Sequence, residues 1–83
     1  MSELIKNIKY AERLISVDTG DTSKNLKNFL EFEKELKGHK KDINNTFASQ
    51  NFSFTKDQLQ ELDFIKKTIK NNRKIINQLI EKL

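Results

Sequence analysis

The last third of the chain, from Phe54 to Leu83, constrains the fold most. Thr55 precedes Gln58 by three positions, the spacing of a capping box in which each side chain accepts the other residue's backbone N–H. No Gly or Pro follows. Apolar residues recur at helical spacing through this segment, at Leu59, Leu62, Ile65, Ile69, Ile76, Leu79, Ile80 and Leu83. The pattern predicts one long amphipathic helix over about residues 56–83.

The apolar side of this helix is wider than a two-stranded coiled coil requires. Phe64 and Ile75 extend it on one flank, so that it covers roughly 160° of the helix circumference. Such a helix must pack against at least two neighbours. Asn72 lies inside the apolar arc, and we interpret it as a partly exposed residue bonded to water or a neighbouring side chain. The alternative is a polar residue that sets the register of an oligomer.

Two further amphipathic segments precede this helix. We expect the first helix over about residues 2–17, with Ser2 as its cap, an apolar face built around Leu4 and Ile8, and cations on the opposite side. Those cations are Lys6, Lys9 and Arg13. The stretch 18–22 is rich in Asp, Thr and Gly and ends the helix.

The second helix is expected over about residues 23–48, with Thr22 or Ser23 as its cap. Gly38 interrupts the pattern, but Ile43 stays in phase with Leu36, which favours one continuous helix. The alternative ends the helix at Lys37 and adds a short fourth helix from His39 to Ala48.

These segments predict a single all-α domain over residues 1–83, a small antiparallel three-helix bundle with a long C-terminal helix. The third helix, at 1.5 Å per residue, would be about 42 Å long and the first only about 24 Å. The first helix is therefore too short to cover the third. We expect part of the apolar arc to be covered by a fourth segment or by a second chain.

The composition excludes most catalytic chemistry. The 83 residues contain no Cys and one His, His39, which we interpret as structural. These residues cannot build a thiolate site, a His-based metal site or a Gly-rich phosphate loop. We therefore expect no enzyme, cofactor or small-molecule substrate. Glu31, Glu33 and Glu35 point in different directions around their helix, and we interpret them as a solvated face. No apolar run has the length of a membrane span and no signal-peptide segment occurs, so we expect a cytoplasmic protein.

Three phenylalanines crowd the bend before the last helix: Phe47, Phe52 and Phe54. We interpret them as a plug over the end of the bundle. The alternative is a platform on which nucleic-acid bases stack.

Two functions remain after these exclusions. The first is a non-enzymatic protein-binding module that uses the apolar face of the last helix to bind a partner or a second copy. Its candidate residues are Phe64, Ile69, Asn72, Ile75, Ile76 and Leu79. The second is binding of nucleic acid or another anionic surface through the cations of the same helix, since the net charge of +4 is concentrated there. Its candidate residues are Lys66, Lys67, Lys70, Arg73 and Lys74. We favour protein binding, because solvated lysines need no further explanation.

The run from Asn71 to Ile80 mixes amide, basic and aliphatic residues in a way that is similar to the last helix of flagellar export chaperones. The general layout also resembles class IIa bacteriocin immunity proteins and small phage-encoded inhibitors, all of them helical binders. The likeness covers a small part of the chain and transfers no site. It implies a small bacterial or phage protein that binds another protein.

Overall fold

Three helices and one short 3-10 turn make up the computed structural model, which describes residues 2–83. α1 spans Glu3–Ile15, α2 spans Thr22–Asn45 and α3 spans Lys56–Glu81, with the 3-10 turn η1 at Ala48–Gln50. No strand occurs among the described residues, so the all-α prediction is confirmed. Met1, the first residue of the predicted domain, lies outside the described residues.

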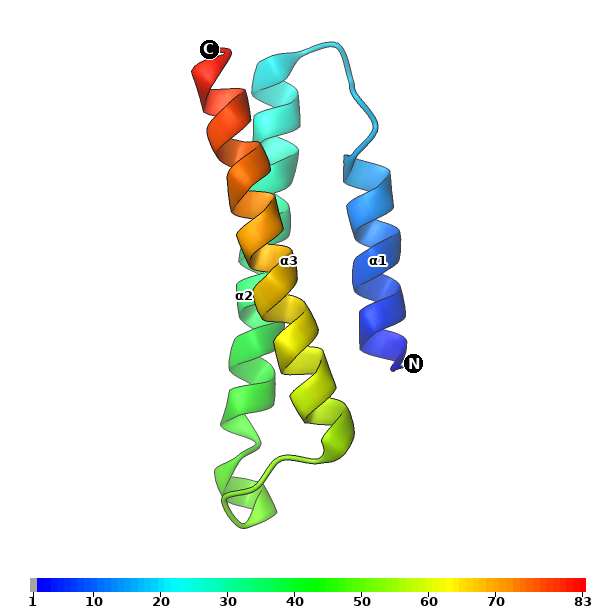
Figure 1. Cartoon of the computed structure of the whole chain (residues 1–83), viewed down its shortest axis with the longest axis vertical. Helices are drawn as coiled ribbons and strands as arrows, with labels where there is room; N and C mark the ends of the chain where they lie inside the picture. The colour runs from blue at the N-terminus through cyan, green and yellow to red at the C-terminus, as the bar shows by residue number, and fades with distance from the viewer. Residues whose placement is uncertain (1) are drawn as a thin grey trace.

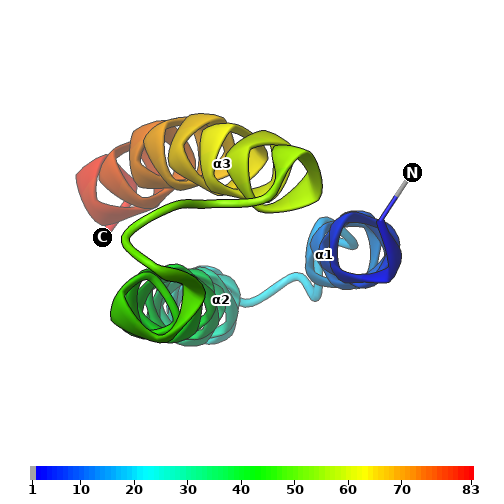
Figure 2. The ribbon, with the colours of Figure 1, turned by 90° about the horizontal axis from the view of Figure 1, so that it is seen from below.

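The two long helices, α2 and α3, lie side by side, and the shorter α1 lies against both (Figure 1). The connection from α1 to α2 is at one end of the molecule, and the connection from α2 to α3 is at the other. Seen along the long axis, the three helices occupy the corners of a triangle (Figure 2). Each helix therefore turns one face toward the other two, which is how a bundle encloses its core. None of the helices within residues 2–83 combines the length and apolar character needed to cross a membrane.

Gly38 lies inside α2, which runs without a break to Asn45. A continuous helix keeps Leu36 and Ile43 on the same buried face, and a Cβ at Gly38 would point into open space. The separate fourth helix from His39 to Ala48 does not form. The chain instead leaves α2 at Thr46, and η1 follows.

The start of α2 differs from the expectation. Asp21 is the cap, because its Oδ1 accepts the N–H groups of Ser23 and Lys24 at 3.0 and 3.3 Å, so that Thr22 is already helical. The preceding turn is tied by Asp18, whose Oδ1 accepts the Gly20 N–H at 2.8 Å. That bond and a second one from Asn25 lower the pKa of the Asp18 carboxyl below its usual value.

The core lies between α2 and α3, and α1 closes its third side. The larger cluster joins all three helices and consists of Ile8, Phe32, Leu36, Ile43, Leu62 and Ile65. A second cluster consists of Phe29, Ile76 and Leu79, with Ile15 of α1 and Leu26 of α2 packed against it. α2 thus covers Ile76 and Leu79, a part of the apolar arc that α1 does not reach, whereas Leu59 and Ile80 of the same arc remain exposed. Each fully buried Leu or Ile, such as Leu36 or Ile65, contributes about 1.5–3 kcal/mol.

The predicted capping box at the start of α3 is confirmed. Thr55 Oγ1 accepts the Gln58 N–H at 3.1 Å, and Gln58 Oε1 accepts the Thr55 N–H at 3.0 Å. The Gln58 amide also exchanges two hydrogen bonds with the Gln50 amide, at 2.8 and 3.0 Å, and donates to Thr46 Oγ1 at 3.1 Å. One side chain therefore joins the end of α2, the turn and the start of α3.

The phenylalanines of this turn form part of the expected plug. The ring centroids of Phe47 and Phe54 are 4.8 Å apart, and Phe54 packs against the larger core cluster. Phe52 touches Phe47 edge-on at 5.7 Å, but 72% of it is exposed. Asn51 and Phe52 both adopt left-handed backbone conformations, with φ of 57° and 56°. For a bulky residue such as Phe52 this conformation costs about 1–2 kcal/mol.

Gln58→Ala is expected to destabilise the protein more than Thr55→Ala, whose cost is about 0.5–2 kcal/mol, the usual range for a lost cap. The Gln58 side chain bonds to three neighbours, whereas the Thr55 hydroxyl accepts one N–H. Urea unfolding measures both, and Gln78→Ala on the exposed side of α3 is the matched control. Equal midpoints for Gln58→Ala and Gln78→Ala would show that the network does not hold the turn.

Candidate functional site

Asn72 joins α3 to α2 in the middle of the molecule. It is 2% exposed, and its Nδ2 donates to the backbone carbonyl oxygen of Phe29 at 2.9 Å. The interpretation of Asn72 as a partly exposed residue is therefore wrong. Its polar group is satisfied within the single chain, as buried amides require, and does not depend on a second copy.

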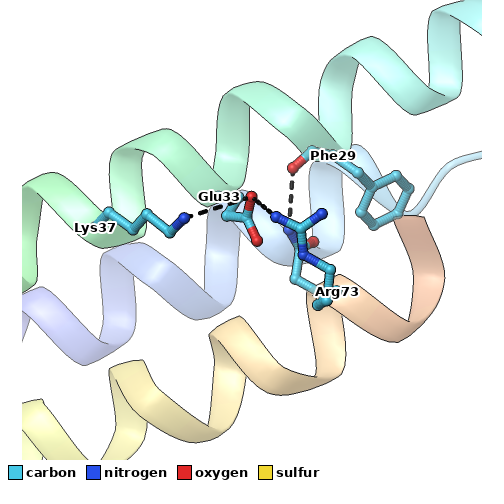
Figure 3. Close-up of polar contacts among 5 residues, drawn as sticks. Phe29, Glu33, Lys37 and Arg73 are labelled. Carbon is cyan, nitrogen blue, oxygen red and sulfur yellow. Dashed lines mark hydrogen bonds and ion pairs between the residues drawn. The ribbon is translucent and has the colours of Figure 1, made fainter. Parts of the chain in front are cut away.

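A carboxylate beside Asn72 provides the second polar link between these helices. Glu33 is buried, and its Oε2 accepts a hydrogen bond from Arg73 Nη2 at 2.5 Å and lies 3.9 Å from Lys37 Nζ (Figure 3). The prediction of a solvated face for Glu31, Glu33 and Glu35 is thus wrong for Glu33. Charge-assisted bonds of this kind are roughly twice as strong as neutral ones.

These contacts decide which of the predicted partner-binding residues a partner can reach. Asn72, Ile76 and Leu79 are buried against α2, so they are not available in this fold. Phe64, Ile69 and Ile75 are half-buried and pack against the edges of the two core clusters. The reachable apolar flank of α3 is consequently the side that carries Phe64 and Ile75.

The predicted anion-binding residues are also divided by their contacts. Arg73 is paired with Glu33, and Lys67 Nζ lies 2.9 Å from Asp63 Oδ2. Within residues 2–83 no ion pair holds Lys66, Lys70 or Lys74, all of which are exposed. Lys66 lines a separate hollow between α2 and α3, with Lys40 and Leu59. The structure therefore does not bring the five cations to one surface.

A groove of about 380 Å³ opens between α1 and α3 around Phe64. It is lined by Ile5, Lys9, Gln60, Asp63, Phe64 and Lys67, and we call it the α1–α3 groove. The Lys9 ammonium lies 5.6 Å from the centroid of the Phe64 ring, within the range of a cation–π contact. Ile5 and Phe64 supply apolar surface, while charged side chains stand at the edges.

Sequence reasoning found Phe64 and Lys67 but missed the contribution of α1 to this groove. Ile5 was not selected, and Lys9 was assigned only to the outward side of its helix. The residues on one flank of a helix do not indicate which neighbouring helix packs beside it. That α1 lies beside the Phe64 flank of α3 is seen only in the folded arrangement of the three helices.

On its other side, α1 borders α2 along a crevice of opposite charge. Two adjoining hollows of about 140 and 170 Å³ share Ala11, Phe32 and Glu35, and Glu31 lines the second of them. We call these hollows the α1–α2 crevice. His39 is half-buried at one end of it, consistent with its structural interpretation.

No group of three or more His, Cys, Asp or Glu side chains among residues 2–83 is arranged to hold a metal ion. Comparison of the chain with protein-family models, with curated proteins and with solved structures found no match.

Asn72→Asp is expected to destabilise the protein by about 3–5 kcal/mol at pH 7, because a buried carboxylate would face the Phe29 carbonyl oxygen without a donor. Burial raises the folded-state pKa of the new carboxyl above its unfolded value near 4. The stability of the variant is therefore retained below about pH 4 and lost as the pH rises. Urea unfolding at pH 7 and below about pH 4 measures this loss of stability.

Asn72→Leu is the matched control for that experiment. It removes the hydrogen bond without adding charge, and the Phe29 carbonyl keeps its bond within α2, so the change should stay within about 1.5 kcal/mol at either pH. An aspartate variant as stable as the leucine variant at pH 7 would contradict the buried position of residue 72.

Proposed function

We propose that this chain is a small antiparallel three-helix bundle that acts as a non-enzymatic protein-binding module of adaptor, chaperone-like, immunity or inhibitor type. Its binding surface would be the α1–α3 groove. The observation that carries the proposal is the half-buried Phe64, which lines a groove of about 380 Å³ between two helices. An aromatic side chain in a concave site flanked by helices is typical of surfaces that accept the apolar face of a partner helix.

Binding of a different protein is favoured over self-association, because α2 covers part of the apolar arc of α3. The long apolar arc suggested a second copy, but α2 buries Ile76 and Leu79 within the chain. What remains reachable is the flank with Phe64 and Ile75, together with the exposed Leu59 and Ile80. A second copy stays one of the partners that this flank could take, and sedimentation equilibrium at micromolar concentration distinguishes it from a heterologous partner.

Nucleic-acid or anionic-surface binding through the cations of α3 is the alternative. It is supported by the exposed Lys70 and Lys74, which lie four residues apart on one side of the helix. It is weakened by the buried carboxylate of Glu33, which holds Arg73. It also gives no role to Phe64, because binding of phosphate groups does not require an aromatic side chain.

Phe64→Ser is expected to weaken partner binding by at least about tenfold, because it removes the aromatic anchor of the groove. Ligands for this test are selected from a displayed library of amphipathic helices, using the immobilised wild-type protein. Ile80→Ser is the matched control, since it removes an exposed apolar side chain of α3 outside the groove. Circular dichroism checks that both variants remain helical.

Selected helices that bind the Phe64→Ser variant as well as wild type would refute the groove as the binding surface. Salt-sensitive binding of a random DNA duplex with sub-micromolar affinity, unchanged in Phe64→Ser, would instead support the alternative function.

A further inference from the structure

We infer that the partner of the α1–α3 groove is an acidic amphipathic helix, an inference that rests on the proposed protein-binding function. The groove combines an apolar floor with a cationic border, and these two features together select for one class of ligand.

One cation from each helix borders the groove. Lys9 of α1 and Lys67 of α3 line it directly. A helix lying along the groove would therefore have a lysine on each side of it.

The one carboxylate that lines the groove is weakly held. Asp63 pairs with Lys67 at 2.9 Å, but their side chains are 64% and 76% exposed. Exposed pairs of this kind contribute about 0–1 kcal/mol, so a partner carboxylate can replace Asp63 at small cost. Arg73 takes no part in the border, because Glu33 holds it on the α2 side.

The opposite side of α1 shows that the charge is local to this groove. The α1–α2 crevice is bordered by Glu31 and Glu35, so an acidic helix is repelled there and attracted to the α1–α3 groove. A net charge of +4 alone would not distinguish these two surfaces. Complementary borders of this kind set the choice of partner and its orientation.

The floor of the groove explains why the ligand is a helix with apolar residues and not a nucleic acid. Ile5 and Phe64 line the groove together with Lys9 and Lys67, and the Phe64 ring contacts the Lys9 ammonium. A phosphate backbone would use the lysines and leave both apolar side chains in contact with water. A helix with apolar residues at i, i+3 or i+4 and i+7, and carboxylates on either side, would contact floor and border together.

The test uses two fluorescent synthetic peptides of about 18 residues, a length at which helices become stable in water. Both carry the same leucine stripe, and the remaining positions are mainly Glu in one peptide and mainly Lys in the other. Anisotropy titration should show that the Leu/Glu peptide binds at least about tenfold tighter than the Leu/Lys peptide, a preference that added salt reduces.

Two charge-reversal variants locate the binding. Lys9→Glu with Lys67→Glu should abolish the preference for the Leu/Glu peptide. Lys27→Glu with Lys34→Glu changes the net charge equally on exposed positions of α2 and should keep that preference. Loss of the preference in both double variants would show a net-charge effect and overturn the inference.

The remaining outcomes separate this inference from the function on which it rests. Equal affinity for both peptides, lost in Phe64→Ser, would overturn the acidic partner and keep the groove as a binding surface. Affinity for either peptide that does not change in Phe64→Ser would overturn the proposed function itself. Binding of a DNA duplex that requires Lys9 and Lys67 but not Phe64 would replace the helix with a nucleic acid.

Discussion

The hydrogen bond from Asn72 to the Phe29 carbonyl fixes how α3 lies along α2, and the rest of the molecule depends on that alignment. Apolar side chains on two long helices can interdigitate in more than one register, because apolar contacts are not directional. A buried amide that finds its acceptor in only one register removes this freedom. The Glu33–Arg73 pair lies one turn along α2 from Phe29 and adds a second constraint in the same alignment.

The register of α2 against α3 also determines where the α1–α3 groove lies. With α3 held in rotation by Asn72, the flank that carries Phe64 points toward α1 and the cations at Lys70 and Lys74 point to solvent. A rotation of α3 by one residue position would move Phe64 by 100° around the helix. The groove is thus a consequence of polar contacts that α3 makes with α2.

Local chemistry made several features predictable from the sequence. The Thr55–Gln58 box depends on residues three positions apart, and the continuity of α2 through Gly38 follows from the phase of Ile43 with Leu36. Contacts between distant residues were not predictable in the same way. An Asn in an apolar arc has the same pattern whether it is solvated, bonded to a carbonyl 43 residues away or paired in an oligomer. Likewise Glu33 differs from Glu31 and Glu35 only in which neighbour it faces. The cap of α2 was missed because Asp21, Thr22 and Ser23 are all competent caps.

α1 is attached to the other two helices by fewer interactions than they make with each other. It buries Ile5 and Ile8, and the Oγ of its cap residue Ser2 donates a hydrogen bond to Glu61 Oε2 of α3 at 3.0 Å. Segments with little buried apolar surface open at lower free energy than the whole protein, and their amide protons exchange with solvent earlier. Because α1 forms one wall of the groove, each local opening of α1 also dismantles the groove. A ligand that spans both walls would close this opening, so its affinity includes the free energy needed to keep α1 in place.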